Sequence, residues 1–341
     1  MNELPVKGAW ILYHTPPEKE RGKTMRKEAK ATKQAAISQI GGYHGGNFHN
    51  ENYAFEGFQS NKYYTSDRYI SLDASFQRTD GKPLKGFGLE IETECSGIHN
   101  PQVLAEVLNK IIFPHFPADL FKLQRDGSLS GDTSAECITQ IMTREFIRNN
   151  YGNFKLMYNT YFPAFGITCG PNCGMHVNIS RGLFGRSDKA QTEAVRKLYY
   201  IVNKHYDLCC ALFHRDRSRT GYCSRMAHSM EYCKSLDLGS CSSNHGVSFN
   251  LGHWNTGRIE IRLVGGQKNY ACFRNTMESV FHLCDAVKTL TWADCDDLTK
   301  IFAGCNQYVF DRLKSYCRDS GTITAADLEK IRPTVQQVDL I

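Results

Sequence analysis

The sequence predicts an α+β protein in which helices pack on one side of a sheet. Alternating apolar and polar residues predict strands, and these fall at 86–94, 134–142, 173–180, 246–251 and 258–264. Helical segments are not regularly interleaved with these strands, and no glycine-rich phosphate loop follows one of them, which argues against a doubly wound nucleotide fold. With 341 residues, 41% of them hydrophobic, the chain can bury a sizeable core.

The helices are predicted from apolar spacing. Asn100-Pro101 is expected to begin a helix, because the apolar residues that follow it recur with a helical period. Long helices are expected over 187–213 and about 273–290, the second with a continuous apolar stripe. Shorter helices, including 298–317, are expected to close the chain over its last 50 residues or so.

The chain divides into an extension and a main domain. Residues 1–66 are expected to form a basic, partly flexible amino-terminal extension, with a charged helix at 18–33 and a loop rich in Gly, His and Asn at 41–50. This extension is either a solvated surface element or a basic arm that grips an anionic partner. The denser apolar pattern after it predicts one domain over 67–341.

Composition excludes several classes of function. The net charge of +6 is mild, and its basic residues are spread along the chain, so it does not predict a nucleic-acid partner. No apolar run approaches the ~18–20 residues that span a bilayer, and the amino terminus lacks the apolar core of a signal peptide. We therefore expect a cytoplasmic protein with no membrane partner.

The 14 cysteines are expected to be reduced and structural, because most lie within apolar helical or strand patterns. Zinc binding is the alternative, since Cys169 and Cys173 are four residues apart. A structural zinc site usually has a second close pair at a defined distance, and a clean second pair is missing from this sequence.

The segment 86–94, Gly-Phe-Gly-Leu-Glu-Ile-Glu-Thr-Glu, is the most informative stretch. A strand has a side-chain period of two, so Glu90 and Glu92 project from one face about 7 Å apart. Adjacent carboxylates repel each other, and burying them is costly unless a cation neutralises them. The segment is therefore either a half-exposed strand with a solvated acidic face or part of a cation site.

Four further motifs carry polar side chains on strands or at their ends. They are Arg125-Asp126-Gly127-Ser128-Leu129, the strand with Glu136, the strand with His176 and Asn178, and Arg258-Ile259-Glu260-Ile261-Arg262. Each alone has an ordinary explanation, such as a hairpin turn, a core histidine or a surface ladder of charges. Together, carboxylates, an imidazole and arginines match what Mg²⁺ and a polyphosphate require.

These five motifs occur in the order expected for the amidoligase family, which the chain resembles over residues 86–285. Those enzymes are carboxylate–amine ligases of the glutamine synthetase-like superfamily. The resemblance implies a glutamine synthetase-like catalytic fold over 67–341, with a mostly antiparallel, curved sheet. It also implies that ATP and two Mg²⁺ (or Mn²⁺) ions drive the joining of a carboxylate substrate to an amine through an acyl phosphate.

The resemblance also implies a set of metal ligands. Glu90 and Glu92 would each bind one of the two metal ions. Glu136 would join Glu92 at the metal facing the substrate carboxylate. His176 and Glu260 would join Glu90 at the metal that bridges the ATP phosphates.

The remaining roles concern phosphate and substrate. Arg262 would hold the γ-phosphate, with Arg258 and Arg225 assisting, and Arg262, Glu92 and Asp126 would form the catalytic set. Asp126 lies in a turn that recurs in the family, where it would bind the amine or position a loop. The sequence departs from the family at Asn178, where many members have a second histidine.

Other features and readings stay open. His245 stands near a position that is often basic in the family, and its imidazole could titrate. The basic loop 214–245 would receive an acidic substrate or serve as an ordinary surface loop. One alternative function is a guanidino-kinase-like phosphotransferase of the same superfamily. The other is a non-enzymatic, cysteine-rich protein that binds nucleic acid or zinc, which would leave the co-facing carboxylates unexplained.

Overall fold

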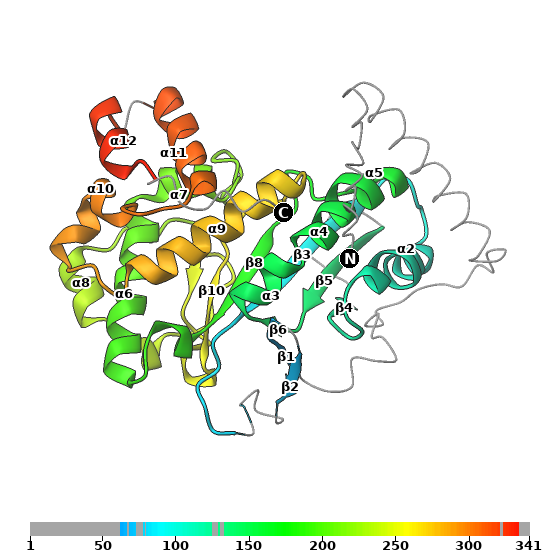
Figure 1. Ribbon diagram of the computed structural model, residues 1–341, viewed down its shortest axis with the longest axis horizontal. Coiled ribbons are helices and arrows are strands. Elements are labelled where there is room, and N and C mark those ends of the chain that lie inside the picture. The colour runs from blue at the N-terminus through cyan, green and yellow to red at the C-terminus, as the bar shows by residue number, and fades with distance from the viewer. Residues whose placement is uncertain are drawn as a thin grey trace, which may run out of the picture.

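The computed structural model describes residues 62–66, 68–72, 78, 80–124, 129, 133–320 and 323–333. The basic segment 18–33, the loop 41–50 and Asp126 lie outside the described residues. A ten-stranded sheet forms the centre of the described part (Figure 1). Its strands are β1 (Lys62–Tyr64), β2 (Tyr69–Ser71), β3 (Phe87–Cys95), β4 (Phe121–Gln124), β5 (Ser134–Thr139), β6 (Ile141–Met142), β7 (Ile167–Thr168), β8 (Met175–Ser180), β9 (Phe249–Asn250) and β10 (Arg258–Ile261).

Strand β3 is the organising strand of this sheet. Along the main path the order is β2-β1-β6-β3-β8-β10-β9, and β5 and β7 also pair with β3. Every described strand pairing is antiparallel except that of β1 with β6. The predicted α+β class is therefore confirmed, with a mixed sheet in which antiparallel pairs prevail.

The helices follow and separate these strands along the chain. The α-helices are α2 (Pro101–Val107), α3 (Arg144–Asn149), α4 (Tyr151–Leu156), α5 (Phe162–Phe165), α6 (Asp188–Lys204), α7 (Tyr206–Leu212), α8 (Met230–Ser235), α9 (Tyr270–Ala286), α10 (Leu298–Ile301), α11 (Gln307–Ser320) and α12 (Ala325–Ile331). Shorter helical turns are η1 (Leu108–Ile112), η2 (Phe113–His115), η3 (Met157–Tyr161), η4 (Arg181–Phe184), η5 (Leu238–Ser240), η6 (Trp254–Thr256) and η7 (Ala293–Asp296).

Two helices predicted as continuous are divided. The segment expected as one helix over 187–213 forms α6 and α7, because His205 between them leaves the helical region with φ −100° and ψ 39°. The segment expected over 298–317 forms α10 and α11. Gly304 lies between them at φ +70°, a left-handed conformation that a helix cannot contain. Both helices end because of the backbone conformation of a single residue, and the spacing of apolar residues does not predict such breaks.

The helix-covered face of the sheet is apolar. Phe87, Leu89 and Ile91 of β3 are at most 1% exposed. The ring centroid of Phe87 lies 4.8 Å from that of Phe281, so α9 packs against this face of β3. Because successive strand residues point to opposite faces, the carboxylates of β3 face away from these helices. The sheet therefore presents its acidic positions on the other side.

The sheet begins inside the stretch expected to be an extension. Strand β1 pairs in parallel with β6 and antiparallel with β2, and its Tyr63 and Tyr64 are each 3% exposed. These tyrosines join the apolar core, so at least residues 62–64 of the stretch 1–66 belong to the main domain. Within the described part of the chain, none of the helices has the length and apolar character needed to cross a membrane.

Candidate functional site

Strand register brings the predicted acidic and histidine positions together. Glu90 is the cross-strand partner of His176, and Glu92 is the partner of Glu136. On the next strand pair, Glu260 of β10 is the partner of Asn178 of β8. Cross-strand partners share a face of the sheet, so strands β5, β3, β8 and β10 contribute to one polar surface.

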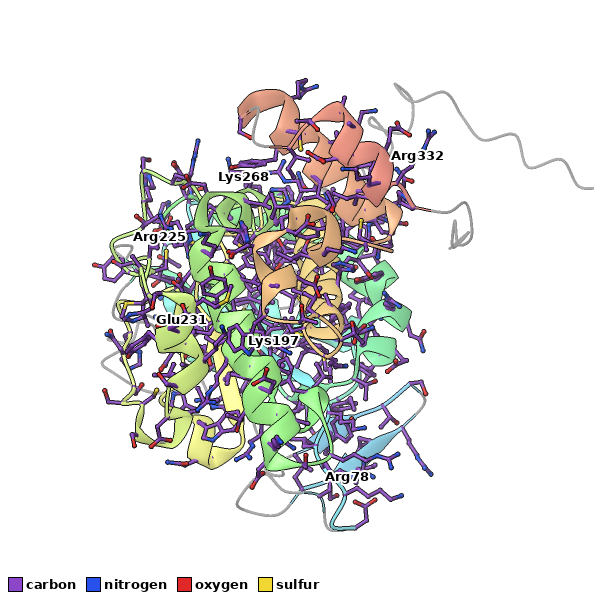
Figure 2. All side chains as sticks on the ribbon, turned by 90° about the vertical axis from the view of Figure 1, so that its left-hand side faces the viewer. Arg78, Lys197, Arg225, Glu231, Lys268 and Arg332 are labelled. Atoms are coloured by element: carbon purple, nitrogen blue, oxygen red, sulfur yellow. The ribbon has the colours of Figure 1, made fainter. Side chains whose placement is uncertain are left out.

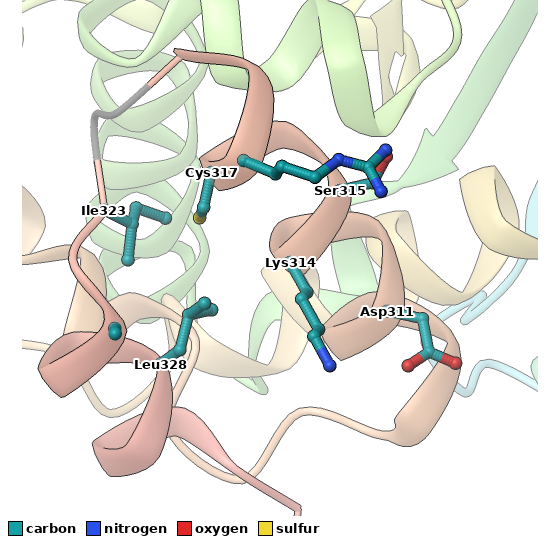
Figure 3. A pocket seen from close by; sticks show the side chains of 8 residues that line it. Asp311, Lys314, Ser315, Cys317, Ile323 and Leu328 are labelled. Carbon is teal, nitrogen blue, oxygen red and sulfur yellow. The ribbon is translucent and has the colours of Figure 1, made fainter.

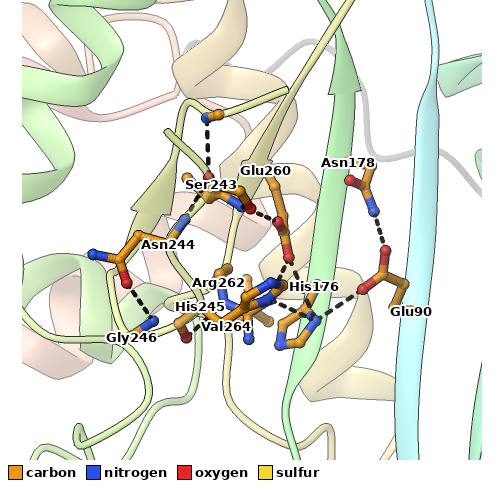
Figure 4. A network of polar contacts seen from close by, with 12 residues as sticks. Glu90, His176, Asn178, Ser243, Asn244, His245, Gly246, Glu260, Arg262 and Val264 are labelled. Carbon is orange, nitrogen blue, oxygen red and sulfur yellow. Dashed lines mark hydrogen bonds and ion pairs between the residues drawn. The ribbon is translucent and has the colours of Figure 1, made fainter. Parts of the chain in front are cut away.

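Three of these residues form a compact group of metal-ligand atoms. One ligand atom each from Glu90, His176 and Glu260 lies within 4.8 Å of the other two (Figure 4). His176 Nδ1 lies 2.9 Å from Glu90 Oε2 and 3.6 Å from Glu260 Oε1. His176 is 8% exposed and Glu260 is 3% exposed, whereas Glu90 is half-buried, so the group lies at the edge of the protein interior. The structure thus brings together the three residues that the family resemblance assigns to one metal ion.

Amide side chains hold the outer oxygens of these carboxylates. Asn178 Nδ2 donates to Glu90 Oε1 at 2.7 Å, and Asn250 Nδ2 donates to Glu260 Oε2 at 2.8 Å. Asn178 Oδ1 in turn accepts from Arg258 Nη1. The other oxygen of each carboxylate, Glu90 Oε2 and Glu260 Oε1, lies near His176, and Glu260 Oε1 also accepts from Arg262. This arrangement fixes the orientation of the ligand atoms, as outer contacts do in metal sites.

Hydrogen bonding sets the protonation of the Glu90–His176 pair. Burial of Glu90 favours its neutral form, but hydrogen bonds from His176 and Asn178 and the nearby positive charges outweigh burial and lower its pKa to about 2. Burial lowers the pKa of His176, whereas the hydrogen bond to Glu90 raises it, and the net pKa is raised. Glu90 is therefore ionised at neutral pH.

Arg262 lies directly against this group. Its Nη1 donates to Glu260 Oε1 at 2.6 Å and lies 3.5 Å from His176 Nδ1. Its Nε donates to the backbone carbonyl of His245 at 3.2 Å. His245 thus contacts Arg262, the residue predicted to bind phosphate, through its main-chain oxygen and not through its imidazole (Figure 4).

The second predicted metal position is built differently. Glu92, which is 6% exposed, has Oε1 3.6 Å from His176 Nε2, and its Oε2 accepts from the backbone N–H of Gly174. The imidazole of His176 therefore lies between Glu90 and Glu92. Glu136 is half-buried, and the register places its Cα opposite that of Glu92. Across the described residues, neither carboxylate belongs to a group of three convergent ligand atoms.

Two predicted site residues are not brought into this group. The guanidinium of Arg225 donates to the carbonyls of Asn203 and Lys204, at 2.8 and 3.4 Å, at the carboxyl end of α6 (Figure 2). These contacts cap helix carbonyls that have no partner within the helix, and they use Arg225 outside the carboxylate group. The predicted assisting role at the phosphate is not what its contacts indicate. Asp126 lies outside the described residues.

Asn250 was missed by sequence reasoning. It lies on β9, opposite Glu260 in the strand register, and is 1% exposed. Its segment was predicted only as a strand, and a single asparagine on a short strand carries no signal of its own. Only the strand register with β10 places Asn250 opposite Glu260, and that register depends on the loop between the two strands.

The cysteines and the pocket lie apart from this chemistry. Twelve of the 14 cysteines are buried, all are free thiols, and burial raises the pKa of Cys173 to about 12. In the described part of the chain, the group of Glu90, His176 and Glu260 is the one set of at least three potential ligands that converges, and it contains no cysteine.

An open pocket of about 460 Å³ between α11 and α12 is lined by residues such as Cys317, Ile323 and Leu328 (Figure 3). It contains none of the predicted site residues.

Comparison with known proteins gives no family. No family model matches the chain, and no curated protein matches it. Among solved structures, the class II 3-hydroxy-3-methylglutaryl-CoA reductase from Streptococcus pneumoniae bound to NADPH aligns at 8% identity with a TM-score of 0.18. That alignment covers 93% of this chain and 94% of the reductase. A likeness of this size carries no inference about fold or chemistry, so a function must be argued from the site.

Proposed function

We propose that this protein is an ATP-dependent carboxylate–amine ligase with a glutamine synthetase-like fold. The observation that supports it best is the convergence of Glu90, His176 and Glu260, from three strands, with Arg262 bonded to Glu260. The resemblance of five ordered sequence motifs to the amidoligase family supplies the reaction type. A solvated acidic surface would not need amide groups to orient the buried carboxylates.

The ligand chemistry of the group suits a divalent cation. Two carboxylate oxygens and an imidazole nitrogen within 4.8 Å of one another are donors that Mn²⁺ accepts readily and Mg²⁺ accepts when oxygens predominate. When bound, such an ion would neutralise the β- and γ-phosphates of ATP. His176 must present an unprotonated nitrogen to bind it, so a proton on the imidazole competes with the metal.

Arg262 would act on the transferred group. Its planar guanidinium remains charged and matches the geometry of phosphate oxygens. Held at Glu260 and at the carbonyl of His245, it would stabilise negative charge on the γ-phosphoryl group as that group moves. The hydrogen bond to Glu260 holds the guanidinium at the edge of the ligand group.

The proposed reaction has two balanced steps. A carboxylate oxygen of the substrate attacks the γ-phosphorus, the bond from that phosphorus to the β-bridging oxygen breaks, and ADP leaves. The amine nitrogen then attacks the acyl carbon, the bond from that carbon to the phosphate oxygen breaks, and inorganic phosphate leaves. The nitrogen loses a proton to solvent or a base, and an amide results.

The proposal is tested by phosphate release. We expect the natural protein, with ATP and Mg²⁺ or Mn²⁺, to release phosphate only when an acceptable acid and amine are both present, in a screen of amino acids and polyamines. Mass spectrometry should then detect an amide. A stable phosphorylated acceptor without free phosphate would instead identify a phosphotransferase.

Two variants tie the reaction to the site. Glu92→Ala and Arg262→Ala proteins should keep the fold, judged by circular dichroism, and lose at least ~100-fold in phosphate release because charge stabilisation of the transferred group is removed. Arg217→Gln is the matched control, since Arg217 is exposed and lies 3.4 Å from Asp207. Full activity in either site variant would refute the assignment.

A further inference from the structure

A β-bulge lies directly after β10, at Arg262. The last regular pair of β10 with β8 is Ile261 with Val177, and the next paired residues of these segments are Gly265 and Gly174, which form an isolated bridge. Between these two points one segment has the three residues 262–264, and the other has the two residues 175–176. Segment 262–264 therefore contains an extra residue. Bulges of this kind occur next to active sites, where they redirect a side chain.

The hydrogen bonds on the other side of the segment agree with a bulge. The backbone N–H groups of Arg262 and Leu263 both donate to the carbonyl of Ser248, at 2.9 and 3.1 Å. Two consecutive residues thus share one partner on the neighbouring segment, which is the defining pattern of a bulge. The β8 strand serves the last carbonyl of the bulge, because the N–H of Met175 donates to that of Val264 at 3.3 Å, and the carbonyls of Arg262 and Leu263 need another donor.

That donor is the guanidinium of Arg215. Its Nη2 donates to the carbonyl of Val264 at 2.6 Å and to that of Arg262 at 3.3 Å, and its Nε donates to that of Leu263 at 3.4 Å. One side chain therefore contacts all three consecutive carbonyls of the bulge. An arginine fits this task because its donors lie in one plane with fixed spacing, which a lysine ammonium lacks.

The backbone around Arg215 is arranged to permit this approach. His214 has φ +54°, an uncommon conformation for a residue with a side chain. Gly265 donates its N–H to the carbonyl of Phe213 at 3.0 Å, and a Cβ on Gly265 would lie 2.3 Å from the carbonyl oxygen of His214. A glycine at 265 is thus required for the segment bearing Arg215 to lie against the bulge.

We infer that Arg215 is a positioning residue that holds the bulge carrying Arg262, and thereby places the Arg262 guanidinium at the γ-phosphate. This inference rests on the proposed function, because it concerns the arginine to which that function assigns the phosphate. From the sequence alone, Arg215 is one of several basic residues in the loop 214–245, which could receive an acidic substrate. Its three contacts with backbone carbonyls direct it into the protein instead.

Nucleotide binding tests this inference. We would measure Mg²⁺–ATP and Mg²⁺–ADP binding by isothermal titration calorimetry for the natural protein, Arg215→Ala and Arg215→Lys, with Arg217→Gln as the matched control from the same loop. Both Arg215 variants should bind ATP about 10-fold more weakly, because displacement of Arg262 loses a charged hydrogen bond to the γ-phosphate. ADP binding should be unchanged, because ADP lacks the group that Arg262 would contact.

A double variant tests whether Arg215 affects ATP binding through Arg262. In an Arg262→Ala background, adding Arg215→Lys should weaken ATP binding no further, since the residue it positions is gone. Equal weakening of ATP and ADP would mean that Arg215 has a structural role only, and an additive double variant would mean that it acts independently of Arg262. Either result overturns the inference. Failure of the natural protein to bind ATP at all would overturn the proposed function, and the inference would fall with it.

Discussion

The two ends of the candidate site use the same kind of residue but are organised differently. At one end, Glu90, His176 and Glu260 converge from three strands, and Asn178 and Asn250 hold the outer carboxylate oxygens. At the other end, Glu92 and Glu136 face each other across one strand pair, and Glu92 accepts from a backbone N–H. The first end is organised by the protein alone, so we expect it to bind a cation before any substrate does.

This difference predicts two classes of metal affinity. Glu260→Gln should weaken the tighter Mn²⁺ site by about 100-fold or more, because it replaces a charged ligand in a buried group. Glu136→Gln, at the other end, should leave the tighter site within about threefold. Electron paramagnetic resonance of free Mn²⁺ measures both affinities without nucleotide. The comparison fails if Glu136→Gln weakens the tighter site as much as Glu260→Gln does.

The outer amide groups give a smaller effect at the same end. Asn178→Ala should weaken Mn²⁺ binding about 10-fold, because Glu90 Oε1 loses the 2.7 Å donor that fixes the carboxylate. The control is Asn255→Ala, which removes an exposed amide bonded to the Gly239 carbonyl. Mn²⁺ titration should show no change in the control. Equal affinity of Asn178→Ala and the natural protein would mean that the strands alone orient Glu90.

The sequence predicts which acidic and histidine positions lie on one face, but not the contacts that support them. A period of two along a strand places Glu90 and Glu92 on one face without any knowledge of their neighbours. Which residue lies opposite depends on register between distant strands, so Asn250 remained hidden. Arg215 and Arg225 show the same limit, since both lie in one basic loop and both donate to backbone carbonyls, yet only Arg215 contacts the segment of Arg262. Which carbonyls each arginine contacts therefore depends on the conformation of the loop and not on the residue type.

Gly174 lies between Glu92 and Arg215, and its replacement should affect both side chains. A Cβ at this position would lie 3.2 Å from Arg215 Nη2 and 3.4 Å from Glu92 Oε2. Gly174→Ala should therefore displace one or both groups and lower phosphate release about 10-fold, with a loss of about 1–2 kcal/mol in the free energy of unfolding.

Gly152→Ala is the matched control, because its Cβ would meet nothing within 4 Å and it lies in α4. It should stabilise the protein by about 0.5–1 kcal/mol through helix propensity and leave activity unchanged. Urea unfolding and the phosphate assay measure both proteins. A fully active Gly174→Ala protein would show that Arg215 and Glu92 have room to move without consequence.

The last prediction concerns the stability of the loop that carries Arg215, away from the ligand atoms themselves. Burial, followed by the charges of Arg312 and Lys268, lowers the pKa of His214 to about 3. The folded protein thus keeps this imidazole neutral, whereas the unfolded chain takes up a proton near pH 6.5. The free energy of unfolding should therefore decline as the pH falls from about 6.5 toward 3, because the unfolded state binds the extra proton.

His214→Asn isolates this contribution. Asparagine tolerates the left-handed backbone at this position and does not titrate. The two proteins need not have the same free energy of unfolding at pH 7. Between pH 7 and pH 4.5 the difference between them should shift in favour of the variant by about 2.5 kcal/mol. Urea unfolding at both pH values measures the shift. Parallel pH profiles would mean that the imidazole is protonated in the folded loop, where it would add positive charge beside Arg215.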